Sequence, residues 1–115
     1  MRFLFILTQI EEAWTKAPPG SAERVAEEYK VLEQELKKAG KFIDSIRLRP
    51  RNEAKTLRNR PNGKRTQIEG TYTETAEVMG GLYILDFASM TEALEWARRM
   101  PNYGHGAIEV RPIWE

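Results

Sequence analysis

His105 is the only histidine of the chain and the side chain best suited to exchange a proton near neutral pH. It lies between Gly104 and Gly106, in a segment that we expect to be an exposed loop, where catalytic and binding groups are common. A general base is one interpretation of this histidine. Because the local sequence fixes no acidic partner beside it, an exposed turn histidine without a partner is the other.

Glu109 and Arg111 are two residues apart in the last apolar segment. If this segment is a strand, both side chains point to the same face. A carboxylate and a guanidinium on one face could bind a polar ligand, and Glu109 could join His105 in acid–base catalysis. The same spacing also suits an ion pair between strands or between two copies of the chain.

Glu69, Tyr72 and Glu74 are candidates for ligand binding, and Glu77 follows them shortly before Gly80 and Gly81. Carboxylates that face a partly dry cavity raise one another's pKa values and could supply both an acid and a base. A solvated loop explains the same composition. With a single histidine and no cysteine, the chain has no recognisable set of metal ligands, so we expect neither a metal nor a cofactor.

The length of 115 residues and the hydrophobic content of 41% fit one domain spanning residues 1–115. A net charge of +1 gives no global attraction to nucleic acid or membranes. The absence of cysteine excludes disulfides and is compatible with a cytoplasmic protein. Residues 1–10 are apolar, but they are too short to cross a membrane and lack a signal-peptide cleavage site.

Residues 47–65 form a strongly basic segment. They contain eight basic residues and only Glu53 as an acid, a net charge of +7, whereas the rest of the chain has 10 basic and 16 acidic residues and carries −6. Such a patch could meet RNA, DNA or an acidic protein. Because the segment contains no aromatic residue for base stacking, we favour a solvated hairpin that protects strand edges from aggregation.

Strand patterns and turn residues divide the chain into elements. Ser21 is expected to cap a first helix that Gly40 ends, and Ser89 with Glu92 forms a capping box for a second helix that ends before Pro101.

Gly80 and Gly81 precede a strand, where close packing or a bulge explains them better than a phosphate loop. The expected strands are 2–7, 41–49, 82–87 and 107–114, with a polar hairpin of arms 55–60 and 64–68.

Without the hairpin, the element order is strand, helix, strand, strand, helix, strand. This order predicts an α+β, ferredoxin-like βαββαβ fold with an extra β-hairpin. Strands 2–7 and 82–87 are apolar on both faces, so the sheet face opposite the helices needs a cover. We expect a homodimer in which two such faces pack together around a cavity. The alternative is a monomer whose hairpin folds over this face.

The last third of the chain contains a recognisable set of residues: Glu74, Glu77, Gly80, Gly81, Glu92, Ala93, Trp96, Ala97, Pro101, Gly106, Ile108, Glu109, Val110, Arg111 and Pro112. With this set the chain resembles the YCII-related family, specifically its DGPF subgroup. That resemblance implies a ferredoxin-like fold that pairs into a dimeric α/β barrel.

The chain departs from the family pattern at positions linked to chemistry. The name-giving Asp-Gly-Pro-Phe is replaced by residues 69–72, Glu-Gly-Thr-Tyr, and a following lysine by Ala76. Tyr29 and Met100 align with the histidine and aspartate for which the wider family is suspected of catalysis. A reaction that uses this pair is therefore not expected here, although Tyr29 remains a candidate for ligand binding.

Two functional hypotheses follow. The first is a cofactor-independent acid–base enzyme that acts on a small polar organic molecule in the barrel cavity. The second is a noncatalytic small-molecule-binding or regulatory dimer, which the loss of the His and Asp pair favours. Both expect a homodimer in the cytoplasm, without membrane attachment, and nucleic acid as a partner is disfavoured.

Overall fold

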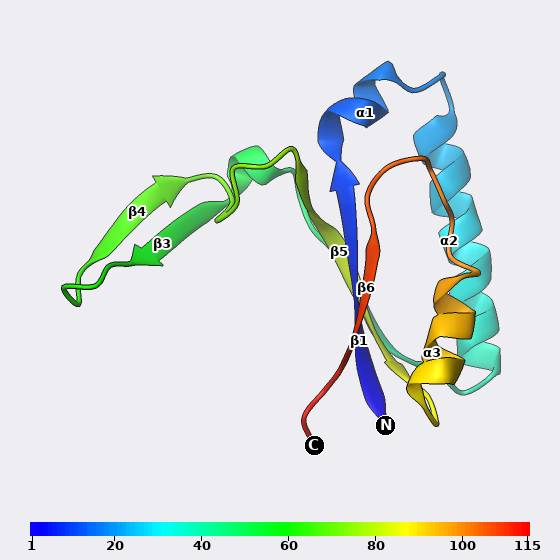
Figure 1. The fold of residues 1–115 in the computed structure, drawn as a ribbon. Helices are drawn as coiled ribbons and strands as arrows, with labels where there is room; N and C mark the ends of the chain where they lie inside the picture. Colours follow the sequence, from blue (N-terminus) through cyan, green and yellow to red (C-terminus); the bar gives the residue numbers. More distant parts are fainter.

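The computed structural model describes all 115 residues. A four-stranded sheet is covered on one side by helices, and a separate two-stranded hairpin projects on the other side (Figure 1). The elements are β1 (Arg2–Ile10), α1 (Glu11–Lys16), α2 (Ser21–Lys38), β2 (Phe42–Arg47), a 3-10 turn (Arg51–Glu53), β3 (Lys55–Asn59), β4 (Arg65–Glu69), β5 (Glu77–Asp86), α3 (Met90–Ala97) and β6 (Ile108–Pro112). No helix is both long and apolar enough to cross a membrane.

The main sheet has the order β2-β5-β1-β6 and is antiparallel throughout. The two apolar strands, β1 and β5, therefore occupy its centre. This is the order of a ferredoxin-like βαββαβ fold, so the predicted α+β class and element order are confirmed. The hairpin β3–β4 is inserted between the second and third strands of that pattern and forms its own sheet.

The core lies between the sheet and the helices α2 and α3. Alternate residues of β1 and β5 point into it, because side chains alternate across a strand. Its fully buried large side chains are Phe3, Phe5, Leu36, Leu85 and Phe87. Met100, which follows α3, is buried in the same cluster and only 5% exposed.

The other sheet face carries no helix. We call it the open face and define it by the central apolar residues Leu4, Ile6, Ile46, Leu82 and Ile84. Leu4 lies opposite Ile84, and Leu82 lies between Ile6 and Ile46, so these side chains share one surface. None of the five is fully buried, and Ile46 is 45% exposed. The expectation that the central strands are apolar on both sides is confirmed.

Two helix starts differ in how well the sequence predicts them. At α3 the Ser89 hydroxyl accepts a hydrogen bond from the Glu92 backbone N–H at 3.2 Å, as predicted. At α2 the predicted Ser21 cap is wrong, because Gly20 with φ +86° occupies the N-cap position. The Ser21 hydroxyl donates to the Pro18 carbonyl oxygen at 2.7 Å and closes the preceding turn instead.

The glycine pair lies inside β5, which begins at Glu77 rather than after the glycines. The pairing of β1 with β5 shifts by one residue here, since Leu7 lies opposite Gly81 while Thr8 lies opposite Met79. Gly80 is the extra residue of this bulge, as the bulge interpretation predicted. A Cβ atom on Gly81 would lie 2.8 Å from the Ile46 carbonyl oxygen, so the close approach of β2 also requires a glycine.

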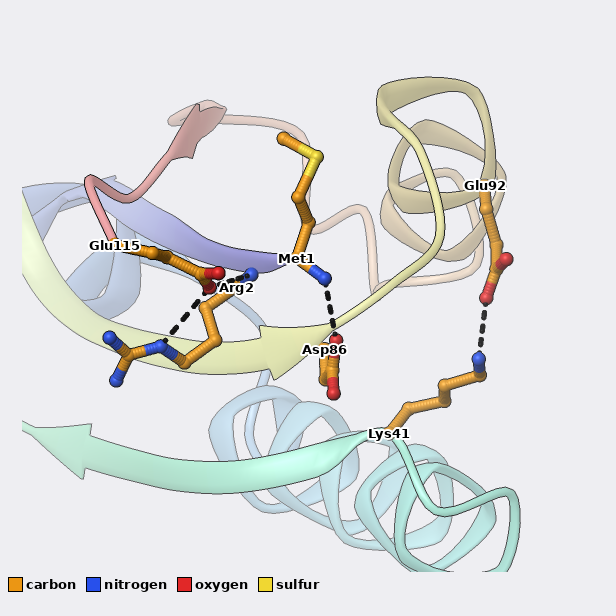
Figure 2. Close-up of polar contacts among 6 residues, drawn as sticks. All are labelled: Met1, Arg2, Lys41, Asp86, Glu92 and Glu115. Atoms are coloured by element: carbon orange, nitrogen blue, oxygen red, sulfur yellow. Dashed lines mark hydrogen bonds and ion pairs between the residues drawn. The ribbon is translucent and has the colours of Figure 1, made fainter.

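Two ion pairs join the ends of the chain to the sheet and to each other, and a third joins the start of β2 to α3 (Figure 2). The N-terminal ammonium contacts Asp86 at 3.1 Å, Arg2 contacts Glu115 at 3.4 Å, and Lys41 contacts Glu92 at 2.9 Å. Surface pairs of this kind each contribute about 0–1 kcal/mol. They therefore do not determine the fold.

Candidate functional site

A cleft of about 610 Å³ lies between the first half of α2 and the end of the sheet where β1 meets α1. This volume falls within the usual range for small-molecule sites, roughly 300–1,000 Å³. The side chains that carry chemistry in the wall are Gln9, Glu11, Trp14, Tyr29, Lys30, Glu33, Ser45, Arg47, Tyr83 and Tyr103.

Small residues create this space. The part of α2 that faces the cleft carries Ala22, Val25 and Ala26, and the opposing strand carries Gly80 and Gly81, which have no side chains. Further along α2, larger residues such as Leu32 and Leu36 reach the sheet and are buried. The helix and the sheet therefore pack fully at one end and leave a hollow at the other.

The Tyr29 hydroxyl is the group of the cleft that most directly indicates ligand binding. It is buried and has no hydrogen-bond partner in the protein. The nearby Tyr103 hydroxyl donates its own proton to the Thr8 carbonyl oxygen at 2.8 Å, so it does not donate to Tyr29. An unsatisfied buried hydroxyl costs about 1–3 kcal/mol, so the protein maintains this group in the cleft at the expense of stability.

Three phenols of the cleft have raised pKa values. Burial, followed by the proximity of Tyr103, raises the pKa of Tyr29 well above its ordinary range. Burial and then the negative charge of Glu33 raise the pKa of Tyr83 to about 12, and burial is also the main reason that the pKa of Tyr103 is raised. All three are therefore neutral near pH 7 and can donate hydrogen bonds, but they are poor bases.

The charged groups of the cleft differ in how much of their bonding capacity is used. The Glu11 carboxylate accepts from the Arg51 backbone N–H at 3.0 Å, and Glu33 accepts from the Ser45 hydroxyl at 2.8 Å. Lys30 and Arg47 form no ion pair. Each carboxylate can accept further hydrogen bonds, but the groups without any partner are the Tyr29 hydroxyl and these two cations, which favours a ligand that presents acceptors or negative charge.

Comparison with known proteins shows the family of the chain. The sequence model of the YCII-related domain family matches residues 1–115. The chain belongs to the YCII-related family. An uncharacterized protein of Rhizobium meliloti (strain 1021) is 35% identical to it over 106 residues, which cover 90% of this chain and 82% of that protein.

In this YCII-related protein, Tyr29 and Met100, the residues that the sequence analysis matched to the family's suspected His and Asp pair, lie in different surroundings. Tyr29 lines the cleft, as described above. Met100 is buried among core side chains and supplies no carboxylate. The phenol at the first position therefore has no acidic partner at the second.

His105 lies outside the cleft, beside a smaller hollow of about 280 Å³ near the end of α3. Its Nδ1 atom accepts a hydrogen bond from the Ile10 backbone N–H at 3.0 Å. Its ring lies against Trp14 and Tyr103, with centroid distances of 5.0 Å and 4.7 Å. No hydrogen bond or ion pair joins His105 to a carboxylate. The contacts are those of a side chain that fixes a loop to the end of β1.

Glu109 and Arg111 lie on the same face of β6, as their spacing predicts, and this is the open face. Glu109 is opposite Ile6, and Arg111 is opposite Leu4. The two side chains are more than half exposed and form an ion pair with each other at 3.7 Å. They line neither the cleft nor the hollow beside His105.

The acidic candidates before the glycine pair do not gather around the cleft either. Glu69 ends β4 and pairs with Lys55, and hydrogen bonds from Lys55 and then Gln67 lower its pKa. The expectation that crowding raises carboxylate pKa values is therefore wrong for this residue. Tyr72 is 69% exposed, and Glu74 is also exposed.

Among the predicted site residues, only Tyr29 lines the cleft. The sequence reasoning missed Arg47, Lys30, Tyr83 and Tyr103. A usable signal was the coincidence of small residues on one face of α2 with a glycine pair on a strand, which predicts a gap in packing. Which side chains surround that gap depends on the tertiary arrangement of α2, β2 and the loop before β6.

Proposed function

We propose that this YCII-related protein is a homodimeric, noncatalytic binding protein that holds a small organic molecule in the cleft beside α2. The ligand has an apolar or aromatic body and an acceptor group, preferably a carboxylate. The same proposal includes membership of the DGPF subgroup and a cytoplasmic location, which the cysteine-free sequence suits.

The unsatisfied Tyr29 hydroxyl carries this proposal. Buried polar groups in proteins nearly always have a partner, so an exception that lies in a cleft of ligand size calls for a functional explanation. A ligand oxygen that accepts from this hydroxyl would remove the penalty. The cations Arg47 and Lys30, which have no carboxylate partner, would balance a negative charge.

The other residues of the cleft wall indicate that the body of the ligand is apolar. Eleven of the twenty lining residues are hydrophobic, including Trp14 and Tyr83, so a planar or branched apolar group would replace water favourably. The Trp14 indole N–H already donates to Gln9 at 3.0 Å, which leaves the indole ring as an apolar wall.

Binding is favoured over acid–base catalysis because the cleft contains no histidine and its ionisable groups are already engaged or protonated. Its three phenols stay protonated, and its two carboxylates already accept hydrogen bonds from the protein. His105, the best residue for an acid–base enzyme in the barrel cavity, uses Nδ1 to accept from a backbone amide. The enzyme hypothesis would require the Nε2 atom of His105 to contact the carboxylate of Glu109 across a dimer interface.

Benzoate and benzylamine form a matched pair of probes for the cleft, because they share a ring and differ in charge. We expect benzoate to raise the melting temperature of the protein and benzylamine to leave it unchanged. Replacing Tyr29 with Phe should weaken benzoate binding by about tenfold, the loss of one charge-assisted hydrogen bond. Without ligand, the same variant should be more stable by about 1 kcal/mol, since it removes the unsatisfied hydroxyl.

Tyr103→Phe is the control for the stability effect, because its hydroxyl has a partner and its loss should destabilise the protein. Tyr72→Phe, at an exposed site outside the cleft, is the control for affinity. Equal affinity of benzoate for the wild type and Tyr29→Phe, measured by calorimetry, would remove Tyr29 from the site. Tighter binding of benzylamine than benzoate would reverse the proposed charge preference.

A further inference from the structure

The hairpin β3–β4 is structurally separate from the rest of the chain. We call residues 55–69 the arm. Every hydrogen bond and ion pair that its residues form stays within residues 54–72. An isolated two-stranded hairpin is only marginally stable in water, so the arm is expected to gain stability from a further contact.

The direction of the arm restricts what that contact can be. It projects on the side of the main sheet opposite α2 and α3, beyond the open face (Figure 1). The Cα radius of gyration, 16.2 Å, exceeds the roughly 13 Å expected for a compact chain of this length. The five residues of β3 alone span roughly 17 Å, whereas packed sheets are about 10 Å apart. A second sheet on the open face would therefore lie within reach of the arm.

The charge of the arm is not balanced within it. Lys55 pairs with Glu69, the only acid of the arm, whereas the four cations nearest the turn form no ion pair: Arg58, Arg60, Lys64 and Arg65. Outside residues 47–65 the chain carries −6. A copy of the same chain therefore offers the charge that complements the arm.

From these observations we infer that the arm is a clasp, which reaches past the open face of its own subunit and binds a second copy, whose residues outside 47–65 carry a net negative charge. The inference rests on the homodimer of the proposed function and adds a specific interaction surface to it. Leu57, which is 63% exposed on the arm, provides an apolar contact beside the cations. In a twofold dimer, each arm clasps the other subunit.

A second copy explains these features better than nucleic acid does. Residues 47–65 contain no aromatic side chain on which a base could stack. Nucleic acid would also leave the open face uncovered, whereas a second copy covers the open face and the arm together. Binding to nucleic acid is therefore the competing outcome of the test.

The arm can be deleted without moving the rest of the chain, because the residues on its two sides are adjacent. The Gly70 backbone N–H donates to the Ala54 carbonyl oxygen at 2.8 Å, so the two ends of the arm are adjacent and Asn-Gly can replace residues 55–69. A second variant keeps the arm but neutralises its tip, with Arg58→Gln, Arg60→Gln, Lys64→Gln and Arg65→Gln. A control removes four cations elsewhere that form no ion pair, with Lys16→Gln, Arg24→Gln, Lys38→Gln and Arg98→Gln. Circular dichroism verifies that each variant is folded.

Dimer dissociation constants from sedimentation velocity test the clasp. Both arm variants should raise the dissociation constant by about tenfold or more, while the control should change it far less. Raising NaCl from about 50 mM to about 500 mM should weaken the wild-type dimer but not the dimer of the shortened variant.

Each contrary result has a distinct meaning. An unchanged dissociation constant for the shortened variant would overturn the clasp and leave the dimer through the open face intact. A monomeric wild type would overturn both the clasp and the dimer, but not the ligand-binding cleft. Salt-dependent binding of a single-stranded oligonucleotide that is lost with the arm, without an effect on dimerisation, would assign the arm to nucleic acid instead.

Discussion

At the scale of single residues, Gly106 has a stricter requirement than the functional candidates beside it. Its φ is +78°, and a Cβ atom there would lie 2.1 Å from the Thr8 carbonyl oxygen. Gly104 has a similar φ of +86° but no atom near the corresponding position. An alanine at either position would therefore have a strained backbone, but only an alanine at position 106 would also clash with a neighbouring strand.

We predict that Gly106→Ala lowers the free energy of unfolding by about 3 kcal/mol or more, because β1 and the loop must move apart. Gly104→Ala should cost only about 1 kcal/mol, the usual penalty of a left-handed conformation for alanine. Urea denaturation of both variants provides the comparison. Equal losses would mean that the loop shifts freely away from Thr8.

A second prediction concerns Tyr83, for which burial raises the pKa from 10.0 to about 12. In the unfolded chain this phenol ionises near pH 10, whereas in the folded protein it keeps its proton until about pH 12. Below pH 10 the phenol is neutral in both states, and its stabilising contribution is fully present. As the pH rises from 10 to about 12, the phenol ionises in the unfolded chain first, so this contribution to the free energy of unfolding is lost. The loss should be on the order of 1–3 kcal/mol.

Tyr83→Phe should make stability less dependent on pH across this window, and Tyr72→Phe, at an exposed site, serves as the control. The measurement is urea denaturation at about pH 9 and at about pH 11.5. If Tyr83→Phe loses as much stability as the wild type between these pH values, other groups account for the alkaline loss.

At the scale of elements, most of the sheet and both long helices could be predicted because their signals are local. Phe3, Phe5 and Leu7 alternate along β1, and the Ser89 cap with Pro101 frames α3. The short helix α1 was missed, because residues 11–16 have neither a capping residue nor an apolar stripe of their own. Its Trp14 packs against Tyr103, a contact that the local sequence does not reveal.

The candidate site was less predictable than the elements for the same reason. Spacing placed Glu109 and Arg111 correctly on one face of a strand, but it could not say that this face is the open face rather than the cleft. The key property of Tyr29 is the missing partner of its hydroxyl, and the neighbouring Tyr103 hydroxyl uses its own proton on Thr8. Contacts between residues so far apart in sequence arise only from the assembled fold.

At the scale of the whole molecule, the open face and the arm pose one problem: the subunit exposes an apolar surface and extends a charged hairpin beyond it. Central sheet strands that are apolar on both faces are normally covered on both. The helices cover one face, and the arm projects away from the other. A twofold dimer through the open face would cover it without any further chain.

Ile84→Glu tests this dimer, because it adds a charge to the centre of the open face, opposite Leu4. In a dimer the unpaired buried carboxylate should cost about 3 kcal/mol, on the order of a hundredfold in the dissociation constant. In a monomer the same carboxylate would face water and have little effect. Val31→Glu, at a 47% exposed position on α2, adds the same charge away from the face. Light scattering should therefore give half the wild-type mass for Ile84→Glu and the full wild-type mass for Val31→Glu. Equal masses for all three proteins would exclude the open face as the interface.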